Sequence, residues 1–327
     1  MNPAFSVIFL TTLIGAGQGL FFALFASQSY AMVGVLPAQD SGFFALGGAL
    51  SLLLMLAGLF AAVFHLGKPS YFITRAWRGI TQWRTSWLSR ELIAMPLVMA
   101  LLFAYSLVNL FALDADLFGW GLAGQVPLVV GTLTAAACVA LFVATGMIYA
   151  ALKFLQEWAT PLTVINFFLL GSASGFTLAS AYAGFKAPEL LPFYGGWAIA
   201  LTLAGLATRA AALLRNARIK RISTVQTAIG VRHTQVRQRS MGMMGGSYNT
   251  REFFHGRTLA FLRAVKWIFI LLAFVLPVGL LWLGTASGSA GLLLAAFVVQ
   301  YIGLLFERWF FFAQANHPQN LYYQVVG

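Results

Sequence analysis

The sequence has little charge and almost no cysteine. Lys, Arg, Asp and Glu together make up 9% of its 327 residues, and Cys138 is the only cysteine. A single cysteine can neither form an internal disulfide nor hold an iron–sulfur cluster, so this chain has neither by itself. Because Cys138 lies in the middle of an apolar run, we expect it to be a small buried packing residue.

Acidic residues are especially scarce, with eight Asp and Glu against twenty Lys and Arg. The apolar runs contain no series of carboxylates that would cross a membrane, which argues against a proton pump. They also show no clear inverted duplication of broken helices, which disfavours a transporter. We interpret part of the net charge of +12 as a signal that orients the chain in the membrane, and we expect the rest to contact anionic lipid headgroups or an acidic partner. We do not interpret this charge as a nucleic-acid site.

Apolar residues dominate the composition of the chain. They make up 60% of the chain, and the mean hydropathy is +0.84. A helix needs about 20 apolar residues to cross the hydrocarbon core, and backbone groups in lipid must be paired within the segment. The sequence therefore predicts an all-α integral membrane protein, residues 1–327 forming a single domain of eight transmembrane helices: about Phe5–Ala26, Phe43–His65, Leu92–Ala112, Val126–Ala150, Leu162–Ala183, Tyr194–Leu214, Ala260–Leu283 and Leu292–Phe312.

The basic residues are distributed unevenly between the two membrane faces. With eight spans, nineteen of the twenty Lys and Arg fall on the side shared by both termini, and Lys186 falls on the other. The positive-inside rule then predicts that both termini are cytoplasmic. Two long basic connections, about residues 67–90 and 215–257, lie on this side. The second is either a solvated, lipid-facing loop or a docking platform for a soluble partner.

Small residues recur at short spacing within two of the expected spans. Gly15, Gly17 and Gly19 lie in the first, and Gly171 and Gly175 lie in the fifth. Such spacing allows two helices to approach closely, so it predicts packing and not a functional site.

The ionisable residues close to membrane depth are the candidates for function. His65 ends the second span and Glu91 opens the third. One interpretation is structural: a helix-end histidine bonded to a carbonyl, and an acidic first-turn residue favoured by the helix dipole. The other is a quinone headgroup site, in which His65 donates a hydrogen bond and Glu91 relays a proton. For Glu307 and Arg308 we favour anchoring at the membrane interface.

Haem is a further possibility, because histidine pairs hold b-type haems. Of the four histidines, only His65 and His317 could face one another, at one membrane edge. We therefore do not expect haem b.

The run HLGKP that closes the second span, the arginine-bearing connection and the S-x-E start of the third resemble the membrane-anchor subunits of the dimethyl sulfoxide reductase family. The resemblance covers essentially the whole chain. The ending ERWFFFAQANHPQNLYY is similar to the branch of that family that serves the cytoplasmic sulfite-oxidising molybdoenzyme.

The resemblance implies a haem-free, non-catalytic anchor that exchanges electrons between ubiquinone or menaquinone and an iron–sulfur subunit. The iron–sulfur subunit in turn serves a molybdopterin catalytic subunit. The resemblance therefore implies that the iron–sulfur clusters and the molybdopterin belong to partner subunits and not to this chain. The family's quinone-site residues correspond to His65, Gly67 and Glu91, and its arginine corresponds to Arg75 or Arg78. The charge distribution predicts that this site lies on the cytoplasmic face, and the resemblance implies that the soluble partners dock on that face of a bacterial inner membrane.

Three functions follow as alternatives. The first is an anchor that passes electrons from sulfite oxidation to quinone. The second is an anchor that oxidises quinol for a dimethyl sulfoxide reductase-like terminal reductase. The third is a membrane transporter, which the sparse intramembrane polarity disfavours.

Overall fold

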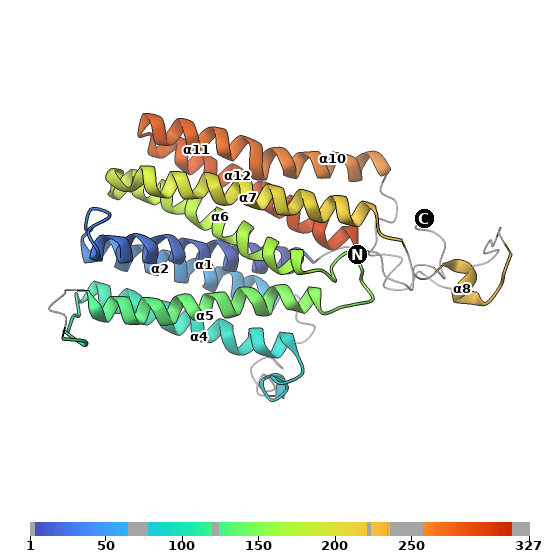
Figure 1. The fold of residues 1–327 in the computed structure, drawn as a ribbon, viewed down its shortest axis with the longest axis horizontal. Coiled ribbons are helices and arrows are strands. Elements are labelled where there is room, and N and C mark those ends of the chain that lie inside the picture. The colour runs from blue at the N-terminus through green and yellow to red at the C-terminus, as the bar shows by residue number, and fades with distance from the viewer. Residues whose placement is uncertain are drawn as a thin grey trace.

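The computed structural model describes residues 4–64, 78–119, 124–220, 224–233, 235 and 258–315. Eight helical segments within these ranges are long and apolar enough to cross a membrane, which confirms the expected all-helical fold (Figure 1). The first five spans along the chain are single helices: α1 (Phe5–Met32), α2 (Ser41–Val63), α4 (Trp87–Leu110), α5 (Gln125–Ala150) and α6 (Pro161–Lys186). The other three are α7 (Leu191–Ala217), which follows the short η1 (Pro188–Leu190); α10 (Leu259–Ile270), which continues through η2 (Leu271–Val275) into α11 (Leu276–Ser287); and α12 (Ala290–Gln314). The short α8 (Val225–Ile229) lies beyond the end of the bundle.

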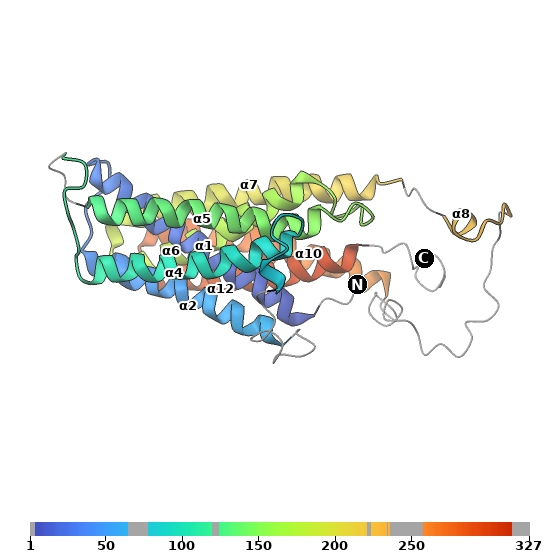
Figure 2. The same ribbon diagram turned by 90° about the horizontal axis from the view of Figure 1, so that it is seen from below.

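Helices α1 and α6 form the centre of the bundle (Figures 1 and 2). They are 78% and 72% buried across their most apolar windows, whereas the other spans are between 28% and 39% buried. Their contact is made by glycines: a methyl group on Gly175 would overlap the backbone of Gly19, and one on Gly15 would lie 3.2 Å from Gly171. The predicted close approach of these two spans is confirmed, and the outer helices face lipid with large apolar side chains.

Polar side chains in the sequence fix where several helices begin. The Asp40 carboxylate accepts a hydrogen bond from the Gly42 amide, the Ser86 hydroxyl from the Ser89 amide and the Thr160 hydroxyl from the Leu162 amide. These oxygens satisfy amides that have no partner within the helix, so each element starts at its cap.

The seventh span departs from the single helix that the sequence predicts. It contains a π-helical turn, Leu271–Val275, in which the hydrogen-bond ladder widens. Gly303 of α12 lies directly against the backbone of this turn, and the Gln300 amide donates to the Ala273 carbonyl at 3.4 Å. The widened turn thus frees a carbonyl that α12 partly satisfies, as is common for π-bulges inside helices.

The eight spans return the chain to the side on which it started, so Phe5 and Gln314 lie at the same end of the bundle (Figure 1). We call this the basic end, because the described residues there include Arg78, Arg84, Arg90, Lys153, Arg215, Arg218 and Lys220. Cys138 is fully buried within α5, which confirms its role in packing.

Candidate functional site

The structure describes two of the five residues that the sequence assigns to a quinone site. His65, Gly67 and Arg75 lie outside the described residues. Arg78 is exposed in a short helical turn at the basic end. A methyl group on the adjacent Gly79 would lie 2.9 Å from Leu92, so this turn packs against the start of α4.

Glu91 is buried, with 7% of its surface exposed. It lies in the second turn of α4, about 6 Å along the axis from the first residue of the helix. The Thr145 hydroxyl of α5 donates to Glu91 Oε1 at 2.6 Å. A carboxylate at this depth is therefore held in one orientation by a neighbouring helix, which a solvated first-turn residue would not require.

The neighbour of Glu91 in sequence fixes the approach of the chain to α4. The Arg90 guanidinium stacks on the Trp87 ring, 4.0 Å from its centroid. It also donates to the Trp83 and Arg84 carbonyls, at 2.9 Å each. Arg90 thereby closes the turn before the helix, and this turn sets the depth at which Glu91 enters the bundle.

Tyr149 follows Thr145 by one helical turn, so the two side chains lie on the same face of α5. Its ring packs in an aromatic cluster with Trp158, Phe167, Phe311 and Phe312. Tyr149 therefore packs against α6 and α12, one turn along α5 from the threonine that holds Glu91.

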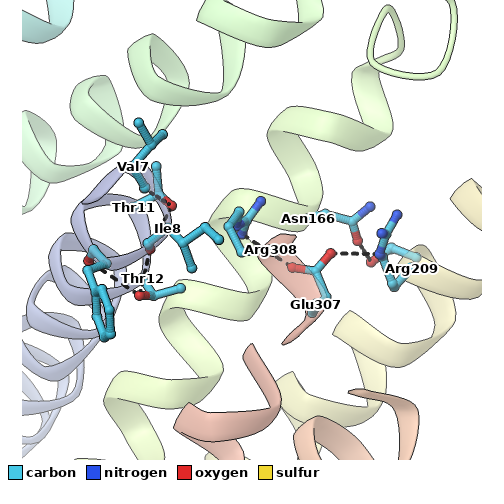
Figure 3. Close-up of polar contacts among 10 residues, drawn as sticks. Val7, Ile8, Thr11, Thr12, Asn166, Arg209, Glu307 and Arg308 are labelled. Atoms are coloured by element: carbon cyan, nitrogen blue, oxygen red, sulfur yellow. Dashed lines mark hydrogen bonds and ion pairs between the residues drawn. The ribbon is translucent and has the colours of Figure 1, made fainter. Parts of the chain in front are cut away.

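A group of charged side chains that we call the buried charge cluster, Arg209, Glu307 and Arg308, lies beside this tyrosine. The Arg209 Nε atom is 2.7 Å from Glu307 Oε1, and an Arg308 terminal nitrogen is 3.7 Å from Glu307 Oε2 (Figure 3). The Arg308 guanidinium stacks over the Phe167 ring at 3.8 Å. All three residues are at most 4% exposed. The carboxylate is thus shared between two arginines inside the bundle.

This arrangement corrects two expectations. The prediction that Glu307 and Arg308 anchor the helix at the membrane interface is wrong, because both side chains point into the bundle between α1, α6 and α7 (Figure 3). Arg209, one of the nineteen Lys and Arg residues that the sequence assigns to the side of the termini, does not lie in a connection but is buried eight residues before the end of α7. Its position within an apolar helical run was the available signal, and its partner was not recognisable because it lies about 100 residues away.

A groove of about 360 Å³ runs between α2 and α4, the helices that carry the candidate site at the basic end. Its wall is almost wholly apolar. The residues along it are Ala45, Leu46, Ala49, Leu52, Leu53, Leu56, Phe103, Ser106, Leu107 and Leu110. Such a groove matches an aliphatic chain in lipid and offers few hydrogen bonds.

The second basic connection begins with residues of different roles. Arg215 donates to the Gln156 carbonyl at 2.9 Å and to the Ala159 carbonyl at 3.4 Å, so it ties α7 to the loop between α5 and α6. Arg218 and Lys220 are exposed. Arg218 and Lys220 are therefore available to contact a partner, whereas the Arg215 side chain is bonded within this chain.

Comparison with known proteins agrees with this architecture. Residues 1–314 match the family described as DMSO reductase anchor subunit (DmsC). The chain is also 56% identical over 329 residues to a sulfite dehydrogenase subunit of Allochromatium vinosum, and the alignment covers 100% of both proteins. A match of this length includes all eight spans and the buried residues described above. The chain is therefore a membrane-anchor subunit and belongs to the DmsC family of DMSO reductase anchor subunits.

Proposed function

We propose that this chain is the quinone-reactive anchor of a sulfite-oxidising complex and passes electrons from an iron–sulfur subunit to the quinone pool. The similarity to a subunit of sulfite dehydrogenase supports sulfite as the source of electrons. The observation that carries the proposal is Glu91, one of two buried carboxylates in the described part of the chain, which the Thr145 hydroxyl holds in the second turn of α4. Ionisable residues at membrane depth are costly, and they are retained where they handle protons or ligands.

The residues around Glu91 fit a quinone. Reduction of a quinone to a quinol takes up two electrons and two protons. The Glu91 carboxylate can hold a proton, while the Thr145 hydroxyl fixes its orientation by donating to Oε1. The Tyr149 hydroxyl has no hydrogen-bond partner among the described residues and can donate to a ligand oxygen. His65, Gly67 and either Arg75 or Arg78 complete the proposed headgroup site.

The apolar groove between α2 and α4 extends this site along the membrane. Leu56 and Phe103, which line it, lie farther from the basic end than Glu91 does. Twelve residues separate Glu91 from Phe103, which is about 18 Å along a helix. An isoprenoid tail attached to a headgroup at Glu91 would therefore reach the groove by lying along the two helices.

The complex that we propose has an iron–sulfur subunit and a molybdopterin subunit on the cytoplasmic side of a bacterial inner membrane. The exposed cations at the basic end, such as Arg218 and Lys220, face these partners or anionic lipid. Both electrons and protons then enter from the same side. We expect little net charge movement across the membrane, and outward proton translocation by the complex in vesicles would contradict this.

Electron flow in the opposite direction, from quinol to the soluble subunits, is a second candidate, because the matching family is described as the DMSO reductase anchor subunit. There, quinol would be oxidised at the same residues and Glu91 would accept a proton. The relative named for sulfite dehydrogenase favours the first direction.

The test is sulfite-dependent reduction of a ubiquinone analogue by the complex purified through a tag on this chain. We expect His65→Ala and Glu91→Gln to abolish most of this activity while sulfite oxidation by an artificial dye persists. Glu189→Gln is the matched control, because Glu189 is exposed at the other end of the bundle. Full quinone reduction in both site variants would refute the proposed site, and loss of the soluble subunits from them would support a structural role.

A further inference from the structure

A pocket of about 330 Å³ lies at the far end of the bundle, opposite the basic end. The last turns of α1 and α4 and the first turns of α2 and α5 surround it. Small-molecule sites typically measure about 300–1,000 Å³ and combine apolar walls with a few fixed polar groups. The pocket is separate from the proposed site at Glu91, because Asn109, which lines it, lies eighteen residues further along α4, about 27 Å away along the helix axis. Most of its wall is apolar and includes Met32, Phe44, Val108, Pro127 and Leu128.

Two amide side chains, Gln28 of α1 and Asn109 of α4, form what we call the polar floor of this pocket. The Gln28 amide donates to Asn109 Oδ1 at 2.8 Å, and the buried Tyr105 hydroxyl donates to Gln28 Oε1 at 2.5 Å. The Asn109 amide donates to the Tyr105 carbonyl at 2.9 Å. A side-chain amide nitrogen carries two N–H bonds, and each of these two uses one within the described structure. The polar floor therefore retains an N–H donor on each amide, held in a fixed orientation, and Asn109 is only 2% exposed.

The backbone at the mouth of the pocket is strained. Ala112, which follows α4 and lines the pocket, has a φ of 47°, in the left-handed region that residues other than glycine rarely adopt. Within the described ranges it is the one non-glycine residue with a positive φ. Such a conformation costs free energy and is found most often where a ligand or an active site is held.

The charge at the mouth disfavours an anionic ligand. Asp114 is the one charged residue among those that line the pocket. Its carboxylate accepts hydrogen bonds from the amides of Gly124 and Ala115, and these bonds, chiefly that from Gly124, hold the pKa of Asp114 below its usual value. Asp114 is therefore ionised at neutral pH and repels the phosphate of a lipid headgroup. The pocket thus fits an uncharged molecule with an apolar body and a hydrogen-bond acceptor.

We propose that this pocket binds the headgroup of a second quinone molecule, whose ring carbonyl accepts hydrogen bonds from Gln28 and Asn109. The inference rests on the proposed function, which brings this chain into contact with the quinone pool. A quinone headgroup is uncharged and apolar in its ring, and its carbonyl oxygens accept hydrogen bonds without donating any. The second site binds quinone and takes no part in the proton transfer proposed at Glu91.

The experiment is photo-crosslinking of the whole complex in nanodiscs with a diazirine-bearing ubiquinone analogue, in the absence of sulfite. We expect the label in two places, near Glu91 and at the ends of α1 and α4 that line the pocket, and excess decylubiquinone should remove both. Label near Glu91 alone would overturn the inference and leave the proposed function intact. Label at the pocket alone would support the inference and contradict the proposed site at Glu91.

Two variants test the pocket itself. Asn109→Leu removes an amide of the polar floor, and Ala31→Phe fills the pocket from α1 while keeping both amides. Each should lower labelling of the pocket by roughly tenfold and leave labelling near Glu91 unchanged. Ala115→Phe is the matched control, because Ala115 is exposed on the same face and does not line the pocket. Unchanged labelling in an assembled Ala31→Phe complex, or an equal loss in the control, would overturn the inference.

A competition experiment needs no variant and tests recognition of the carbonyl. An analogue of decylubiquinone that lacks both ring carbonyls should fail to displace the label from the pocket, because it leaves the N–H donors of the polar floor without an acceptor. Displacement by this analogue as effective as that by decylubiquinone would also overturn the inference.

Discussion

Glu307 is the residue whose removal should cost this protein most. It is 1% exposed and faces two arginines, at 2.7 Å and 3.7 Å. Glu307→Gln keeps the size of the side chain and removes its charge. Both guanidinium groups then remain buried at membrane depth without an anionic partner beside them, since neither can lose its proton.

The magnitude follows from this burial. Breaking a buried ion pair by removing one partner costs about 3–5 kcal/mol, because the remaining charge is left uncompensated. For a chain of this length we take roughly 2 °C of Tm for each kcal/mol, which gives a decrease of about 6–10 °C. The stacking of Arg308 on Phe167 and of Arg209 near Phe269 remains possible and limits the loss.

The assay is thermal unfolding followed by intrinsic tryptophan fluorescence. Trp158 is a suitable reporter, because its indole stacks on Phe311 and donates to the Phe311 carbonyl at 2.9 Å, four residues beyond Glu307. Glu189→Gln is the control: Glu189 is exposed and its contact with Gln39 should be worth less than about 1 kcal/mol. A Tm for E307Q within about 2 °C of the Glu189→Gln control, a margin of about 1 kcal/mol, would refute the assignment of a buried, charged pair.

Two further predictions concern packing and docking. Gly175→Ala should destabilise the chain by about 1–3 kcal/mol, because its methyl group would overlap Gly19 in the central contact of α1 and α6; Gly196→Ala, on an open face of α7, is the control and should not lower the Tm in the same unfolding assay. Arg218→Glu combined with Lys220→Glu should release the soluble subunits during affinity purification, whereas Arg215→Glu should lower the stability of this chain itself. Unchanged recovery of the soluble subunits with the first variant would contradict docking at these two residues.

The spans could be predicted from the sequence because a membrane imposes one simple condition. Any crossing segment must be about 20 apolar residues long and helical, so hydropathy alone places it. The errors are local: most of the expected spans are shorter than the helices, as with Phe5–Ala26 against α1, because interfacial residues continue the helix beyond the apolar core. The π-turn at Leu271–Val275 was not predictable either, since it depends on Gly303 of another helix.

The candidate site, too, could be predicted from the sequence only in part. Glu91 stood out in the sequence because carboxylates are rare there, and the structure confirms that it is buried. Thr145 and Tyr149 gave no signal, since threonine and tyrosine at a helix end have many ordinary roles. Only the packing of α5 against α4 brings the Thr145 hydroxyl to Glu91 and places Tyr149 one turn further along the same face of α5.

By itself, the sequence determined that this protein is an eight-span helical membrane protein, where its glycines allow close contact, and that Glu91 is one of the few ionisable residues near membrane depth. Only the tertiary structure decided which charged residues are buried together as partners. Arg209 and Glu307 are separated by nearly 100 residues, and hydropathy along a chain has no information about which helix faces which. Charge compensation depends on distance in space, so the pairing of these charges exists only in the folded bundle.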